Sequence, residues 1–199
     1  MSIEIFRKII NLTYPKINVE IKNKYGGGIV TLHETDSNAI LKTVTIAGLD
    51  INYSFAFNID IPNDKNYVLS SFLNDKKKYG LRKVCDGVIF NFVENELVVY
   101  LCELKSTNPT GYVNKFRSSE AFIFYLEKIA KEFFDFNKRI IIKRLLFDIK
   151  TGKSKTLTKG NKIPPTKIGY DKNGKQQFIK IYIIHHLKES ESLNIRHLE

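Results

Sequence analysis

The chain has 199 residues, 43% of them hydrophobic, a length and composition that suit one domain with a sizeable core. It has no apolar run long enough to span a membrane, and its first residues lack the pattern of a secretory signal, so we expect a cytoplasmic protein without a membrane partner. The net charge of +11 is typical of nucleic-acid-binding proteins, although lysine-rich composition alone can also produce it.

The first part of the chain predicts a short helix followed by strands. Residues 2–12 have the apolar spacing of an amphipathic helix. Three strands are predicted at residues 29–32, 39–47 and 51–61. With a turn at Gly48-Leu49-Asp50 between the last two, we expect these strands to form an antiparallel meander. Residues 66–79 predict a second helix.

Residues 84–105 predict a β-hairpin. Both halves of this stretch are rich in β-branched and aromatic residues, which favour strands. The polar pair Glu94-Asn95 separates the halves and predicts a two-residue turn. Such a turn makes Val93 and Glu96 partners and thereby sets the register of the whole hairpin.

This register brings three ionisable side chains together. Asp86 falls opposite Glu103, and Lys105 shares the face of Glu103 because side chains alternate along a strand. Buried like charges need a partner or a metal. Two interpretations are open: a divalent cation shared by the carboxylates, or a buried ion pair with lysine that has no chemical role. Cys85 and Cys102 are expected on the other face, as buried free thiols.

A helix and a parallel strand are predicted after the hairpin. Residues 112–136 have apolar side chains at helical spacing, and residues 138–149 read as an apolar strand. Because strand–helix–strand connections place the two strands in parallel, we expect the second strand beside the Glu103 strand.

The C-terminal part, residues 150–197, predicts a basic loop and a final strand over residues 177–187. Residues 150–175 contain many lysines and a single acidic residue, Asp171. We interpret this stretch as a basic flap or hairpin that grips a nucleic-acid backbone, with an ordinary solvated loop as the alternative. The lysines expected to bind nucleic acid there are Lys153, Lys155, Lys159 and Lys162.

The spacing of Asp86 and then Glu103-Leu104-Lys105 resembles the PD-(D/E)XK nuclease superfamily, which includes restriction endonucleases, Holliday-junction resolvases and RecB-type nucleases. The resemblance covers residues 83–147, and Cys85 stands where the family name has Pro. It implies that Asp86 and Glu103 bind Mg²⁺ or Mn²⁺, with the Leu104 carbonyl as a further ligand. It also implies that Lys105 is catalytic, because it positions or activates the attacking water. Some family members have a Gln, Lys or Arg near the scissile phosphate in the first turns of the following helix, which would make Lys115 and Arg117 nucleic-acid-binding residues. The alternative for both is an exposed helix residue. An upstream acidic ligand is common in the family, and the spacing does not choose among Glu20, Glu34, Asp36 and Asp60.

The resemblance also implies a fold and an activity. We expect an α/β (α+β) protein with a restriction-endonuclease-like core, in which helices flank a central mixed sheet and residues 1–63 add an antiparallel β elaboration. Residues 1–199 would form a single domain, with the nuclease-like core over residues 64–149. The expected activity is metal-dependent endonucleolytic hydrolysis of DNA rather than RNA, in defence, restriction or mobile-element biology, and a homodimer is one compatible assembly. The alternative is a non-catalytic module that binds nucleic acid or protein.

Overall fold

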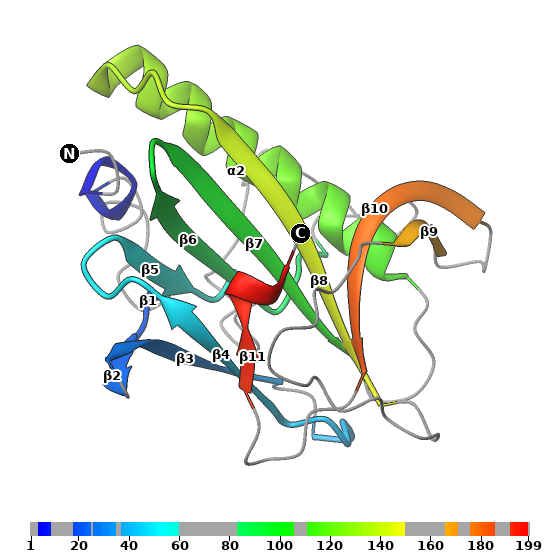
Figure 1. The fold of residues 1–199 in the computed structure, drawn as a ribbon. Coiled ribbons are helices and arrows are strands. Elements are labelled where there is room, and N and C mark those ends of the chain that lie inside the picture. The colour runs from blue at the N-terminus through cyan, green and yellow to red at the C-terminus, as the bar shows by residue number, and fades with distance from the viewer. Residues whose placement is uncertain are drawn as a thin grey trace.

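The computed structural model describes residues 4–8, 18–24, 26–34, 37–59, 83–105, 111–149, 166–170, 176–185 and 192–198. These residues form a mixed α/β fold in which one long helix accompanies two mixed β-sheets (Figure 1). The α+β class predicted from the sequence is therefore confirmed. In the described part of the chain, no helix is long and apolar enough to cross a membrane.

The larger sheet has seven strands and carries the predicted hairpin near its centre. Its first four strands are antiparallel, and the next two continue in parallel. The last strand closes the edge as an antiparallel neighbour. In spatial order the strands are β1 (Asn18–Val19), β5 (Ser54–Phe57), β6 (Gly87–Val93), β7 (Glu96–Lys105), β8 (Ile140–Asp148), β10 (Gln176–His185) and β9 (Thr166–Tyr170).

The hairpin of β6 and β7 has the predicted register. Val93 is opposite Glu96 and Gly87 is opposite Cys102, so one continuous ladder runs the length of the two strands. The turn is tight because Glu94 adopts a left-handed conformation with φ 56°. The main-chain N–H of Asn95 donates to the carbonyl of Val93 at 2.7 Å.

Helix α2 (Tyr112–Phe134) connects β7 to β8, as predicted. It begins after Gly111, whose φ of 78° only glycine adopts readily, and it ends at Asp135, which is also left-handed. β8 is the parallel neighbour of β7 over the whole strand. Hairpin, helix and parallel strand therefore form one continuous unit.

The second sheet has four strands and ends with the C-terminal segment. Its order is β11 (Ser192–Asn194), β4 (Thr43–Leu49), β3 (Gly27–His33) and β2 (Lys22–Lys24). A short 3₁₀ helix, η2 (Ile195–His197), follows β11. β11 pairs in parallel with β4, so a C-terminal segment joins strands that come from residues 22–49 in this sheet.

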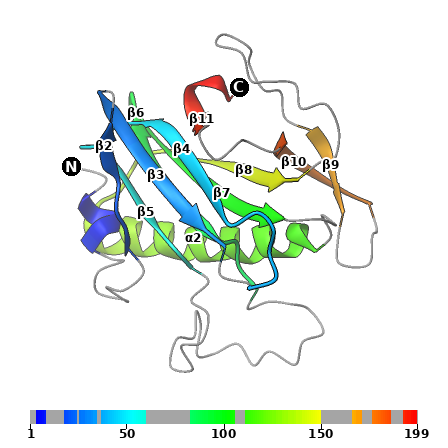
Figure 2. The ribbon, with the colours of Figure 1, turned by 90° about the horizontal axis from the view of Figure 1, so that it is seen from below.

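The molecule has three layers. Helix α2 covers one face of the seven-stranded sheet and the four-stranded sheet covers the other (Figure 2). Alternate residues of β7 supply both cores: Val99 and Leu101 point towards α2, whereas Tyr100 and Cys102 point towards the small sheet. Because both faces are buried, β6 and β7 have almost continuous apolar sequences.

The predicted meander is wrong in its third strand. β3 and β4 are antiparallel neighbours, as predicted, but β5 leaves them and pairs with β6 in the larger sheet. Aromatic packing favours this exchange, since Phe55 stacks on Phe90 with ring centroids 4.7 Å apart, in the core under α2. The turn predicted at Gly48-Leu49-Asp50 lies slightly later, because β4 continues to Leu49 and the main-chain N–H of Tyr53 donates to the carbonyl of Asp50.

Several predicted segments lie outside the described residues. Residues 4–8 are helical, and the rest of the predicted N-terminal helix is not described. The predicted helix over residues 66–79 and residues 150–165 of the basic loop are also outside the described ranges. The end of that loop forms β9, which pairs with β10.

Gly87 allows the two sheets to approach each other beside Asp86. A Cβ atom at this position would lie 2.7 Å from Cδ2 of the buried Leu32 on β3. We therefore expect Gly87→Val to lower the free energy of unfolding by about 1–3 kcal/mol, measured by urea denaturation. Gly27→Val is the matched control, because a Cβ there meets only a main-chain oxygen at 3.8 Å. Equal losses in the two variants would contradict the close-packing explanation.

Candidate active site

Asp86, Glu103 and Lys105 lie together at one end of the hairpin, on the face covered by α2. Lys105 Nζ is 2.8 Å from Glu103 Oε1. Lys115 of α2 joins them, with its Nζ 2.9 Å from Glu103 Oε1 and 3.1 Å from Asp86 Oδ1. Since both oxygens contact the same nitrogen, they are at most about 6 Å apart. The structure thus brings together the three side chains that the hairpin register placed in one area, and adds a second lysine.

Asp86 is held from two directions. Its Oδ2 accepts a hydrogen bond from the main-chain N–H of Leu104 at 2.6 Å, which links it to β7. The preceding residue, Cys85, donates its main-chain N–H to Ser119 Oγ of α2 at 2.9 Å. The position of the carboxylate is therefore set by the strand and the helix together.

Glu103 is a fully buried carboxyl group, with 0% of its side chain exposed. Its Oε2 has no hydrogen-bond partner among the described residues. Burial and the neighbouring Asp86 raise the pKa of Glu103 to about 7, although Lys115 and Lys105 act in the opposite direction. The group therefore changes its charge near neutral pH.

Lys115 is part of this cluster rather than an exposed helix residue. Only 17% of its side chain is exposed. Burial by itself lowers the pKa of Lys115, but Glu103 and Asp86 outweigh burial and raise it above its ordinary value, so the amine stays charged. Its helical spacing from the buried Tyr112 and Ser119 was the sequence signal for this inward position. Arg117, in contrast, is exposed on α2.

Asp148 is an acidic residue near the site that the sequence analysis did not single out. It is the last residue of β8, is 7% exposed, and is the register partner of Lys105. Neighbouring positions in register share a face, so Asp148 lies on the α2 side of the sheet with Lys105. The sequence feature that could have predicted this position is a single aspartate at the end of an apolar strand, predicted to be parallel to the Glu103 strand.

The two cysteines are buried free thiols, as predicted. Cys102 lies in the core under the small sheet, on the predicted face. The prediction for Cys85 is wrong, because this residue lies in the core under α2, on the side of Asp86. Strict alternation does not reach Cys85, since β6 begins only at Gly87. Burial raises the pKa of Cys85 to about 12, so it is a poor nucleophile.

The oxygen donors fit a hard divalent cation that keeps other ligands. Mg²⁺ is commonly held by one or two carboxylates together with water and substrate phosphate. Asp86 and Glu103 provide two neighbouring carboxylates, and the buried Glu103 Oε2 has no protein partner in the described ranges. Those ranges contain no group of three His, Cys, Asp or Glu side chains that could hold a metal. A closed all-protein site, such as structural zinc needs, is therefore not formed by the described residues.

The other predicted site residues are placed as follows. Glu20 and Glu34 are described, but they complete no three-ligand group with Asp86 and Glu103. Six predicted residues lie outside the described ranges, namely Asp36, Asp60, Lys153, Lys155, Lys159 and Lys162.

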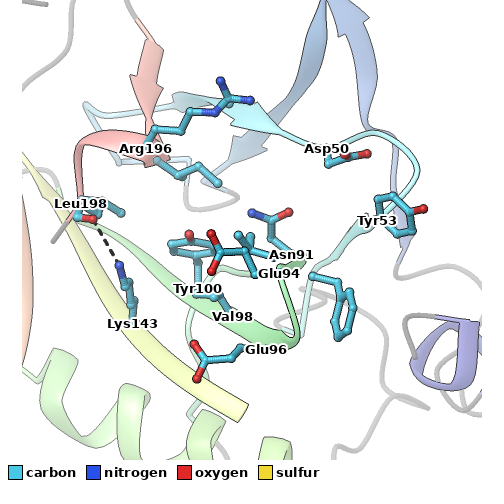
Figure 3. Close-up of a pocket in the computed structure, with 14 residues that line it drawn as sticks. Asp50, Tyr53, Asn91, Glu94, Glu96, Val98, Tyr100, Lys143, Arg196 and Leu198 are labelled. Carbon is cyan, nitrogen blue, oxygen red and sulfur yellow. Dashed lines mark hydrogen bonds between the residues drawn. The ribbon is translucent and has the colours of Figure 1, made fainter. Parts of the chain in front are cut away.

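A cavity of about 670 Å³ lies on the opposite face of the larger sheet (Figure 3). Asp86, Glu103, Lys105 and Lys115 are not among the residues that line it. Buried Asn91 and Tyr100 line it, and Lys143 Nζ donates to the carbonyl of Leu198 at 3.3 Å. The charges around the cavity are mixed, since three carboxylates and two basic side chains line it. The buried carboxylate cluster is the stronger candidate site, because two carboxyl groups and two amines meet there at ion-pair distance.

Comparisons with models of protein families, with curated proteins and with solved structures found no match. The functional interpretation of this protein therefore depends on the geometry of Asp86, Glu103, Lys105 and Lys115.

Glu103 should make the stability of the metal-free protein depend on pH. Its pKa is raised from 4.5 to about 7 by folding, so the native state favours the protonated carboxyl. This contribution to the free energy of unfolding is complete below about pH 4.5. It is lost as the pH rises through about 7, which lowers the free energy of unfolding by about 1–3 kcal/mol. In EDTA, Glu103→Gln should flatten the pH dependence and exceed wild-type stability above about pH 8, as measured by urea unfolding.

Glu96→Gln is the control, because it changes a half-exposed carboxylate at the other end of β7. It should keep the wild-type pH dependence. A Glu103→Gln protein that is much less stable than wild type at every pH would show that Glu103 is needed as an ion-pair partner for the lysines.

Proposed function

We propose that this protein is a metal-dependent nuclease of the PD-(D/E)XK type, in which Asp86 and Glu103 hold Mg²⁺ or Mn²⁺. The observation that carries the proposal is the pair of buried carboxyl groups at one end of the hairpin, with Asp86 directly before β6, Glu103 on the antiparallel β7, and Lys105 in contact with Glu103. The chain order also supports it, because α2 and a parallel strand follow the Glu-x-Lys strand. A restriction-endonuclease-like core is part of the same proposal.

The residues of the cluster have distinct tasks in this proposal. A bound divalent cation lowers the pKa of its water ligand and neutralises charge on the phosphate. Asp86, tied to β7 through Leu104, supplies a carboxylate in a defined orientation. Glu103 supplies the buried carboxylate, and Leu104 a main-chain carbonyl. Lys105, with 25% of its side chain exposed, has access to solvent and orients the attacking water or stabilises negative charge on the phosphate.

The substrate that we propose is DNA. The net charge of +11 provides attraction for a phosphate backbone that is independent of base sequence. The exposed Arg117, on the same helix as Lys115, and the lysines of residues 150–165 are the proposed backbone contacts. The preference for DNA over RNA comes from the resemblance to the nuclease superfamily, as does a role in defence, restriction or mobile-element biology.

A second candidate function is a non-catalytic module that binds nucleic acid or protein. One observation favours it: two lysines already neutralise the two carboxylates in the described structure. In that case the cluster is an ion network without chemistry. The two functions differ in their response to metal and in cleavage.

Asp86→Asn and Glu103→Gln should each abolish cleavage of plasmid DNA in Mg²⁺, while both proteins remain folded. Each change keeps the shape of the side chain and removes charge that the cation needs. Added Mg²⁺ should raise the melting temperature of wild type only, with about 2.7 kcal/mol of stabilisation at 100 times the Kd.

Glu96→Gln again serves as the control and should cleave like wild type. Wild-type protein that neither cleaves DNA in Mg²⁺ or Mn²⁺ nor gains thermal stability from either ion would contradict the nuclease proposal and favour the non-catalytic module.

Replacement of Lys153, Lys155, Lys159 and Lys162 by Gln should weaken DNA binding at every sequence tested. Each lost phosphate contact should reduce the slope of log K against log salt by about 0.9. Fluorescence anisotropy at several salt concentrations measures this slope. The control replaces four lysines elsewhere, Lys22, Lys24, Lys128 and Lys131. Equal slopes for the two quadruple variants would identify residues 150–165 as ordinary solvated surface.

A further inference from the structure

Lys115 occupies a position between the two carboxylates that a shared cation would occupy. Its Nζ contacts Asp86 Oδ1 at 3.1 Å and Glu103 Oε1 at 2.9 Å. Among the described ion pairs, Lys105 joins Glu103 and not Asp86. Lys115 is therefore the side chain that joins both carboxylates through one positive charge.

The backbone that carries Lys115 is held in place on both sides. Ser119, one turn further along α2, accepts the hydrogen bond from Cys85, and Glu120 forms an ion pair with Arg144 of β8. Tyr112 and Val113, the first two residues of α2, are buried. Movement of the amine away from the carboxylates must therefore come from rotation within the lysine side chain, which has a flexible four-carbon stem.

The carboxyl groups of Asp86 and Glu103 are in contact with two amines, those of Lys105 and Lys115. A divalent cation bound to the same carboxylates would add two positive charges a few ångströms from the Lys115 amine. Like charges this close repel each other, and they do so more strongly in a buried site than in water because the effective dielectric constant is lower. The amine and a divalent cation therefore compete for the same two oxygen atoms.

We propose that Lys115 is an exchangeable internal counter-ion: its ammonium group holds Asp86 and Glu103 together in the metal-free protein and leaves them when a divalent cation binds. This inference depends on the proposed function, because it takes the two carboxylates as the metal ligands. It gives Lys115 a regulatory task. The ammonium group must be displaced before a cation can bind, which lowers the metal affinity, and in the metal-free protein it reduces the repulsion between the two carboxylates.

The first test is metal affinity. Isothermal titration with Mn²⁺ should show that Lys115→Met, which keeps the apolar stem and removes the charge, binds Mn²⁺ at least about tenfold more tightly than wild type. Lys128→Met, on the exposed face of α2, should leave the affinity unchanged. Glu103→Gln should lose Mn²⁺ binding and thereby identifies the site that is titrated.

The second test uses wild type alone and does not require Lys115→Met to fold. Acetylation of lysines by acetic anhydride, followed by peptide mass spectrometry, reports which amines are accessible. Lys115 should be protected in EDTA and react several-fold faster at saturating Mn²⁺, whereas Lys128, with 73% of its side chain exposed, should react equally in both.

The outcomes separate the two proposals. The exchange is overturned if Lys115 stays protected at saturating Mn²⁺, or if a folded Lys115→Met binds Mn²⁺ no more tightly than wild type. If wild type still binds Mn²⁺ in these experiments, the proposed metal site stands. Absence of Mn²⁺ binding in folded wild type overturns the proposed function, and the exchange with it.

Discussion

The burial of two carboxylates side by side under a helix is the constraint on which this end of the molecule depends. Asp86 and Glu103 are both almost inaccessible to solvent, and like charges in such a place repel each other strongly. Positive charge from two different elements reduces this repulsion, namely Lys105 on β7 and Lys115 on α2. Helix, hairpin and ion pairs are therefore mutually dependent, because the lysine on α2 reaches both carboxylates only when the helix packs where it does.

Both faces of the hairpin are covered, which explains why the charges gather at one end of it. Along most of β6 and β7, side chains enter the core under α2 or the core under the small sheet, and polar groups there would lose hydration without a partner. Only where the strand reaches Glu103 does a helix residue offer compensating charge. Gly87 belongs to the same arrangement, because its missing side chain gives Leu32 of the small sheet space beside Asp86.

A buried ion network is a weak source of stability. Replacement of such a network by well-packed hydrophobic residues is often neutral or stabilising, because charges lose much hydration energy on burial. The cluster contains four ionisable groups, and the pKa values of Glu103 and Lys115 are both raised. A functional role therefore explains the cluster better than a contribution to folding stability does. We propose phosphodiester hydrolysis as that role, because Asp86 directly precedes β6 and lies beside the Glu-x-Lys sequence of β7. The contacts of Lys105 and Lys115 explain how the two carboxylates are accommodated side by side in the described structure.

The sequence by itself determined the parts of the fold that follow from local periodicity. The register of the hairpin, the span of α2 and the parallel position of β8 follow from alternation, helical spacing and the rule for strand–helix–strand connections. Only the tertiary structure placed Lys115 between the carboxylates and moved β5 into the larger sheet. The reason is physical: both depend on which surfaces of distant segments pack together, such as Phe55 on Phe90, and the spacing of residues along the chain does not specify that choice.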